Sequence, residues 1–133
     1  MIIKMIQGNG EHVLIVDDDE VLRDLATEIL RTLGYTAVAV ASGEQAVQYL
    51  MQNQADLVML DMVMSPGING RETYERVLAF RPGQRAIVVS GFAESSEISR
   101  TLQLGANQLV KKTIYRSRAW IDNQDSLARL KRG

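Results

Sequence analysis

Polar residues stand at the ends of short apolar runs in this chain, and their types are those of a phosphoryl-transfer site. The first run ends in Asp17-Asp18-Asp19-Glu20, the third in Asp61, the fourth in Ser90 and the fifth in Lys111-Lys112. If the runs are parallel neighbours in a sheet, their carboxyl ends meet at one edge, where ligands of such sheets bind. Three or more carboxylates, a hydroxyl and an ammonium group would then converge there.

The predicted cluster of carboxylates needs a cation, because like charges at close range repel one another. A hard divalent cation resolves the repulsion, and Mg²⁺ combines one or two carboxylates with water and phosphate oxygens. A lysine adds a point charge suited to phosphate, and a hydroxyl donates to the same oxygens. The set therefore indicates a Mg²⁺-bridged phosphoryl site, whose central carboxylate can itself be the nucleophile.

Each of these groups also has a structural interpretation when it is taken alone. Asp17-Asp18-Asp19-Glu20 suits a solvated helix start, since acidic residues favour helix N-termini, and Asp61 suits a loop cap. Ser90-Gly91 is typical of a turn, and Lys111-Lys112 of an exposed charge pair. Their joint placement, with one group after each run, favours the site. His12, the single histidine, is interpreted as a surface residue rather than a ligand or base.

Apolar patterns along the chain predict the elements that would position these groups. Short apolar or β-branched runs are typical of strands buried in a parallel sheet, and they lie at 13–16, 36–40, 57–60, 86–89 and 108–111. Apolar residues at steps of three and four predict helices around 21–33, 46–50, 74–78, 98–104 and 120–130. In the first helix the apolar stripe starts at Val21, and Gly34 is expected to end it in the left-handed conformation. Ser42 is expected to cap the second.

Five strand–helix units in this order predict a three-layer α/β domain. Parallel strands joined by right-handed crossovers form its sheet, and helices cover both faces. Residues 1–10 are interpreted as a linker and residues 11–133 as the domain. The methionines, including Met59, Met62 and Met64, are expected to fill the core and its edge.

Composition narrows the classes of protein to which the chain can belong. It has 133 residues, no cysteine, 15 basic and 16 acidic residues, so one domain without disulfides or thiolate metal sites is expected. The charge balance argues against a dominant nucleic-acid surface. The sequence holds no apolar run long enough to span a bilayer and does not begin as a secretory signal. A cytoplasmic domain is the resulting expectation.

These residues resemble the receiver (response regulator) domain of two-component signalling. The resemblance covers about residues 11–114, and the matching segments are 13–20, 60–64, 87–91 and Gly105-Ala106 leading to Lys112. It implies a flavodoxin-like (CheY-like) fold with a five-stranded parallel sheet of order 2-1-3-4-5. The segments 8–12, 70–75 and 90–94 are most similar to receivers of hybrid sensor histidine kinases, so the chain is expected to come from such a protein.

The resemblance implies a role for each residue of the predicted site. Asp61 is the expected phosphoacceptor. Asp18 is expected to bind Mg²⁺ directly and Asp17 through water, and the backbone carbonyl of Val63 completes the metal ligands. Two further residues would act on the phosphoryl group: Ser90 as the switch hydroxyl, and Lys112, preferred over Lys111, as its ion-pair partner.

Partners follow from the same resemblance. A histidine kinase or a histidine phosphotransfer domain is the expected donor, and the phosphoryl group biases an output face. The fourth helix, fifth strand and fifth helix would form that face or a homodimer contact, while no nucleic acid and no membrane is contacted. By itself the domain would be a switch that phosphorylates and dephosphorylates itself, not an enzyme with a separate substrate.

Departures from the family pattern leave two alternatives open. Thr113 replaces the usual proline, Leu109 replaces the usual aromatic of the fifth strand, and the loop after Asp61 is one residue longer. The first two changes keep open a pseudo-receiver, a phosphorylation-independent interaction module, against which the retained acidic, hydroxyl and lysine residues argue. A phosphatase or phosphotransferase would need a second acid two residues after the nucleophile, where Val63 stands, and is therefore disfavoured.

Overall fold

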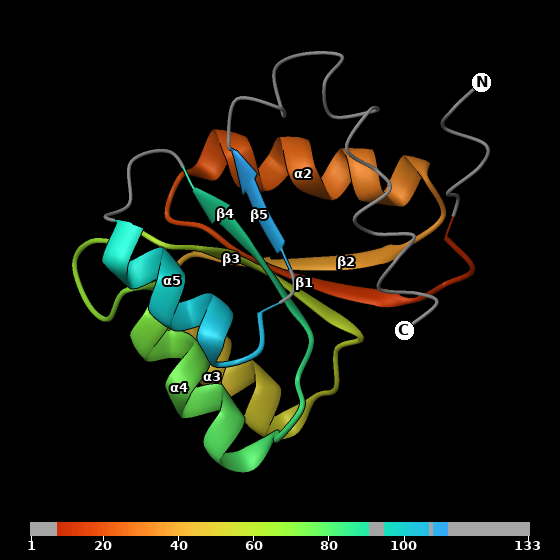
Figure 1. Cartoon of the computed structure of the whole chain (residues 1–133). Helices are drawn as coiled ribbons and strands as arrows, with labels where there is room; N and C mark the ends of the chain where they lie inside the picture. Colours follow the sequence, from red (N-terminus) through yellow and green to blue (C-terminus); the bar gives the residue numbers. More distant parts are fainter. Residues whose placement is uncertain (1–7, 91–94, 107, 112–133) are drawn as a thin grey trace.

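The computed structural model describes residues 8–90, 95–106 and 108–111. In this part of the chain strands and helices alternate, and Figure 1 labels them. The elements are β1 (His12–Val16), α2 (Glu20–Thr32), β2 (Thr36–Val40), α3 (Gly43–Gln52), β3 (Leu57–Asp61), α4 (Gly70–Phe80), β4 (Ala86–Ser90), α5 (Ser95–Gln103) and β5 (Gln108–Lys111). The predicted helix at 120–130, Thr113 and Lys112 lie outside the described residues.

The strands form a parallel sheet with helices on both of its faces. Within the described residues the sheet is five-stranded, in the order β2-β1-β3-β4-β5, and its strand pairs are parallel. Helix α2 covers one face, while α3, α4 and α5 lie together on the other (Figure 1). This arrangement confirms the predicted α/β architecture, and its cause is that each crossover helix buries one apolar stripe against the sheet.

Side chains that alternate along each strand build two cores. In β1, Val13 and Ile15 pack with α2, whereas Leu14 and Val16 pack with α3 and α4. The central strand β3 is buried along its whole length, because both of its faces are covered. Such burial explains the continuous apolar runs seen in the sequence. Met59, Met62 and Met64 are buried in these cores, as predicted.

Two predicted apolar stripes differ from the structure. Val21 is 67% exposed, because it lies in the first turn of α2, on the flank that carries the partly buried Leu25 and Ile29 rather than beside Leu22. On α5, Leu102 is also exposed, whereas Thr101 is fully buried. The hydroxyl of Thr101 donates to the Glu97 carbonyl at 2.8 Å, which satisfies it inside the core.

Local signals place the ends of several helices correctly. Ser42 caps α3, since its hydroxyl oxygen accepts the N–H of Gln45 at 3.1 Å. Gly34 follows α2 with φ of +96°, the left-handed conformation that glycine adopts without strain. Among the residues described, every helix is too short or too polar to cross a bilayer.

Candidate functional site

Asp17, Asp18 and Asp61 form an acidic cluster at the carboxyl edge of the sheet. Val16 pairs with Leu60 in the register of β1 and β3, so the residues that follow, Asp17 and Asp61, lie side by side. One carboxylate oxygen from each of the three aspartates lies within 4.8 Å of the others. The structure therefore brings together the three carboxylates that the sequence placed at strand ends.

Two of the three carboxylates are buried, which makes their closeness costly. Asp17 is 4% exposed and Asp61 is 1% exposed, while Asp18 faces solvent. Backbone donors orient both buried groups: the Asp19 N–H donates to Asp17 Oδ1 at 2.9 Å, and the Val63 N–H donates to Asp61 Oδ1 at 3.2 Å. Buried charges need compensation, and a divalent cation bound by oxygen ligands would supply it.

The segment between β1 and α2 is fixed from both sides. The Asp17 N–H donates to the Val40 carbonyl at 3.2 Å, and the Arg23 guanidinium donates to the Asp17 carbonyl at 2.8 Å. Asp19 caps α2 by accepting the N–H groups of its first turn. Hydrogen bonds therefore fix the backbone on both sides of the exposed Asp18, at Asp17 and at Asp19.

The loop between β3 and α4 borders the cluster and is tethered by two carboxylates, Asp18 of the cluster itself and Glu44 of α3. The Ser65 N–H lies 3.5 Å from Asp18 Oδ2, and the Ile68 N–H donates to Glu44 of α3 at 3.1 Å. Met62 and Met64 are buried, whereas Val63 between them is 51% exposed. Because its neighbours anchor the loop, Val63 stands at the mouth of the site with its side chain in solvent.

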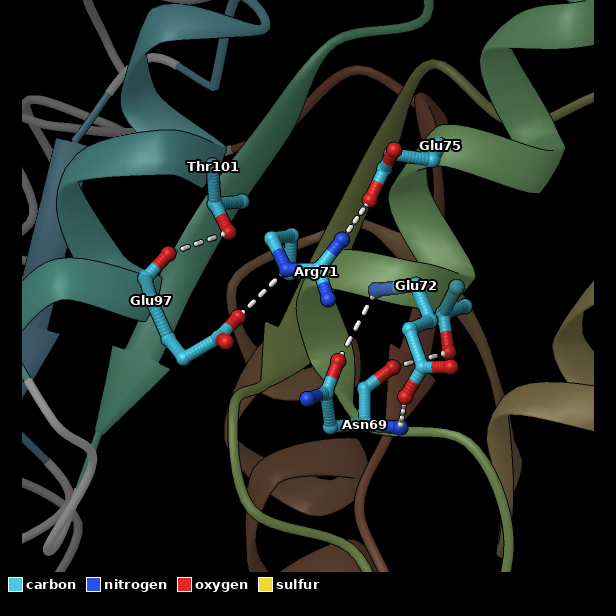
Figure 2. A network of polar contacts seen from close by, with 7 residues as sticks. Asn69, Arg71, Glu72, Glu75, Glu97 and Thr101 are labelled. Carbon is cyan, nitrogen blue, oxygen red and sulfur yellow. Dashed lines mark hydrogen bonds and ion pairs between the residues drawn. The ribbon is translucent and has the colours of Figure 1, made fainter.

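Helix α4 starts directly behind Asp61 with a complete capping box. The Asn69 side chain accepts the Glu72 N–H at 2.9 Å, and the Glu72 carboxylate accepts the Asn69 N–H at 3.2 Å (Figure 2). These two bonds satisfy donors that every helix N-terminus leaves open. Asn69 and Glu72 thereby fix where α4 begins relative to the acidic cluster.

The structure places the other predicted site residues in part. Ser90 ends β4 and pairs in register with Lys111 of β5. It comes one residue after Val89, the partner of Asp61, so its backbone lies at the same edge as the cluster. Lys112, the predicted partner of the phosphoryl group, lies outside the described residues. His12 hydrogen-bonds Thr36 and Tyr49 at the opposite end of β1, away from the cluster.

Sequence reasoning missed several residues that support the site. Asn69 and Glu72, three residues apart at the start of α4, form a capping-box pattern that can be recognised in the sequence. The contacts of Glu44 with Ile68 and of Arg71 with Glu97 join separate elements, and only the packing of helices reveals them.

Comparisons with known proteins agree with this geometry. The family model of the response regulator receiver domain matches residues 13–120. Sporulation initiation phosphotransferase F of Bacillus subtilis (strain 168) is 34% identical over 97 residues, which cover 73% of this chain and 77% of that protein. The autoinducer 1 sensor kinase/phosphatase LuxN of Vibrio campbellii is 32% identical over 108 residues, 81% of this chain.

Longer relatives contain much more than the matched region. The chain spans 13% of the length of LuxN and 27% of that of a cyclic di-GMP phosphodiesterase from Thermotoga maritima, to which it is 28% identical over 102 residues.

Among solved structures, the response regulator protein TrrA from Thermotoga maritima, in complex with Mg²⁺–BeF, is 25% identical with a TM-score of 0.77; the match covers 90% of this chain and 98% of TrrA. Sequence, fold and acidic cluster agree, and the chain belongs to the response regulator receiver domain family.

Proposed function

We propose that this domain receives a phosphoryl group on Asp61 from a phosphohistidine of a histidine kinase or a histidine phosphotransfer domain. The observation that carries the proposal is the convergence of three carboxylates on one edge of the sheet, with Asp61 buried at the end of the central strand. Because Asp61 ends the central strand and lies between the other groups of the site, we assign its carboxylate as the nucleophile.

The acidic cluster fits a divalent cation, and Mg²⁺ is the ion we propose. Its donors are carboxylate oxygens from two strand ends, within 4.8 Å of one another, and hard cations prefer such ligands. We assign Asp18 and Asp61 as direct ligands, Asp17 as a ligand through water, and the Val63 carbonyl as a backbone ligand. When bound, the ion supplies positive charge that offsets the negative oxygens of the transferring group.

The residues of this chain then have defined tasks. The Val63 N–H, on Asp61 Oδ1, holds the carboxylate in a fixed orientation for in-line attack on phosphorus. As the new O–P bond forms, the N–P bond of the phosphohistidine breaks and its electron pair returns to the imidazole. We assign Lys112 and Ser90 to hold oxygens of the resulting aspartyl phosphate, which water later hydrolyses.

Residues 11–133 are proposed to form one receiver domain. Residues 11–133 would make up a three-layer domain with a sheet of order 2-1-3-4-5 and a fifth helix around 120–130, after a linker at 1–10. Similarity to the sensor kinase LuxN over 108 residues supports an origin of this domain in a hybrid sensor kinase, and a cytoplasmic location is proposed for the domain. A homodimer through α5, β5 and the predicted helix at 120–130 stays a prediction. The exposure of Leu102 and Leu104, at the end of α5, supports it.

Labelling with a small phosphodonor tests the proposal. The wild-type chain and the Asp61→Asn variant are incubated with acetyl phosphate and Mg²⁺, and intact mass is measured. We expect one added phosphoryl group on the wild type, lost when Mg²⁺ is chelated, and none on Asp61→Asn. Equal labelling of both proteins would overturn the assignment of Asp61. An unlabelled wild type that also fails to bind beryllofluoride would instead indicate a phosphorylation-independent interaction module.

A further inference from the structure

Arg71 of α4 makes an ion pair with Glu97 in the first turn of α5. Its Nε donates to Glu97 Oε2 at 2.5 Å, and its Nη1 donates to Glu75 on its own helix (Figure 2). The Arg71 and Glu97 side chains are only 22% and 28% exposed. The hydrogen bond that Arg71 donates to Glu97 is the main cause that raises the pKa of Arg71 above its ordinary value. Both carboxylates contact the guanidinium, but only Glu97 joins Arg71 to another helix.

On one side, Arg71 is tied to the backbone that carries Asp61. The preceding residue, Gly70, donates its N–H to the Met62 carbonyl at 3.1 Å. A Cβ on Gly70 would lie 2.5 Å from the Asp61 carbonyl oxygen and 2.8 Å from the Met62 Cα. Because the two backbones are packed this closely, a change in the backbone after Asp61 also displaces the first turn of α4.

On the other side, Glu97 belongs to a helix that is anchored near its middle. The buried Thr101 donates to the Glu97 carbonyl, and Ile98 packs on the core shared by α3 and α4. The first turn of α5 is therefore fixed both by the Arg71–Glu97 ion pair and by the packing of Ile98. Because of these contacts, a shift of the Arg71 guanidinium moves the whole of α5 and not only the Glu97 side chain.

We propose that the Arg71–Glu97 ion pair transmits the state of Asp61 to α5. This inference rests on the proposed function, because it requires a phosphoryl group or its mimic at Asp61. The path runs from Asp61 and Met62 through Gly70 to Arg71, then across to Glu97. It is separate from the connection that Ser90 makes along the chain, and coupling of this kind acts equally in both directions.

Hydrogen exchange with a phosphoryl mimic tests the path. Beryllofluoride with Mg²⁺ is added to the full chain, fluorine NMR reports the bound mimic, and amide exchange is followed in α5 and in β1 as an internal reference. The variants Arg71→Met and Glu97→Gln remove the pair from either side. Glu75→Gln is the matched control, because it removes only the contact within α4. Partly exposed ion pairs contribute little to stability, so all three variants are expected to fold.

In the wild type and in Glu75→Gln, we expect the mimic to change the exchange rate of residues 97–103 by at least about five-fold, the lower end of common coupling between sites. In Arg71→Met and in Glu97→Gln, the bound fluorine signal should persist while that change falls to a small fraction. A bound mimic with an equal change in all proteins overturns the path and leaves the proposed function intact. A wild type without a bound signal overturns both.

Discussion

The backbone of Gly70, which opens α4, lies against the backbone of Asp61, which ends β3. No other residue type fits this position without movement, since a Cβ there would approach the Asp61 carbonyl oxygen to 2.5 Å and the Met62 sulfur to 3.0 Å. The helix is thereby seated directly behind the proposed phosphoacceptor. The consequences for stability and for chemistry are separable by experiment.

Gly70→Ala is expected to lower the free energy of unfolding by about 1–3 kcal/mol, the usual cost of forcing a methyl group into a packed site. The added group pushes on the Asp61 carbonyl, so labelling by acetyl phosphate should also slow in the folded variant. Urea unfolding and the labelling rate measure the two effects. Arg76→Ala, at an exposed position of the same helix, is the control and should change neither. A Gly70→Ala variant as stable as the control would contradict the packing described.

The capping box at the start of α4 should carry a measurable share of stability. Asn69→Ala removes the acceptor of the Glu72 N–H, and loss of such a cap costs about 1 kcal/mol. Glu72→Gln keeps an acceptor for the Asn69 N–H, because glutamine also completes a capping box. Urea denaturation should therefore place Asn69→Ala clearly below the wild type and Glu72→Gln near it. A larger loss in Glu72→Gln would show that charge, not hydrogen bonding, governs this helix start.

Val63 at the mouth of the site predicts slow self-dephosphorylation. Its side chain is 51% exposed and has no polar atom with which to orient a water molecule toward the aspartyl phosphate. Val63→Asn supplies such a group, so the phosphoryl half-life, measured by mass after removal of acetyl phosphate, should shorten several-fold. Val63→Ile keeps the apolar character and should leave the half-life near that of the wild type. Equal half-lives for Val63→Asn and the wild type would contradict the idea that the apolar Val63 side chain slows hydrolysis.

The sequence predicted the fold well because the inner strands β1, β3 and β4 are buried on both faces along nearly their whole length. The run Leu57–Leu60, for example, has no polar residue and proved to be the fully buried central strand. The acidic cluster followed from the same reasoning, since parallel strands put Asp17 and Asp61 at one edge. Neither inference needed a contact between distant side chains.

Side-chain environments on the helices were harder to predict, for a physical reason. Periodicity assigns a stripe but not where the sheet beneath it stops, so the apolar stripe predicted for this helix includes Val21 although it is 67% exposed. Thr101 was passed over because its hydroxyl is satisfied by the backbone of its own helix, which sequence periodicity does not register. The Arg71–Glu97 pair depends on how closely α4 and α5 approach, a distance set by the whole core.

Tyr35 gives a prediction about stability at alkaline pH. The side chain is 5% exposed, and its burial, with a smaller contribution from the nearby Glu11 carboxylate, raises its pKa from 10.0 to about 12. The folded protein therefore holds the phenolic proton at pH values where the unfolded chain has lost it. Stability from this group is complete below about pH 10 and is lost as the pH rises toward 12.

Urea midpoints measured between pH 9 and pH 12 should reveal this loss, with the onset set by the ordinary tyrosine pKa of about 10. Other groups also titrate in this range, so the informative quantity is the difference between the wild type and Tyr35→Phe. Because phenylalanine has no proton to lose, the wild type should fall toward and then below the variant as the pH rises. Glu11→Gln removes the smaller cause, so its tyrosinate absorbance should appear at slightly lower pH. A difference between wild type and Tyr35→Phe that stays constant with pH would show that the phenol is not protected by the fold.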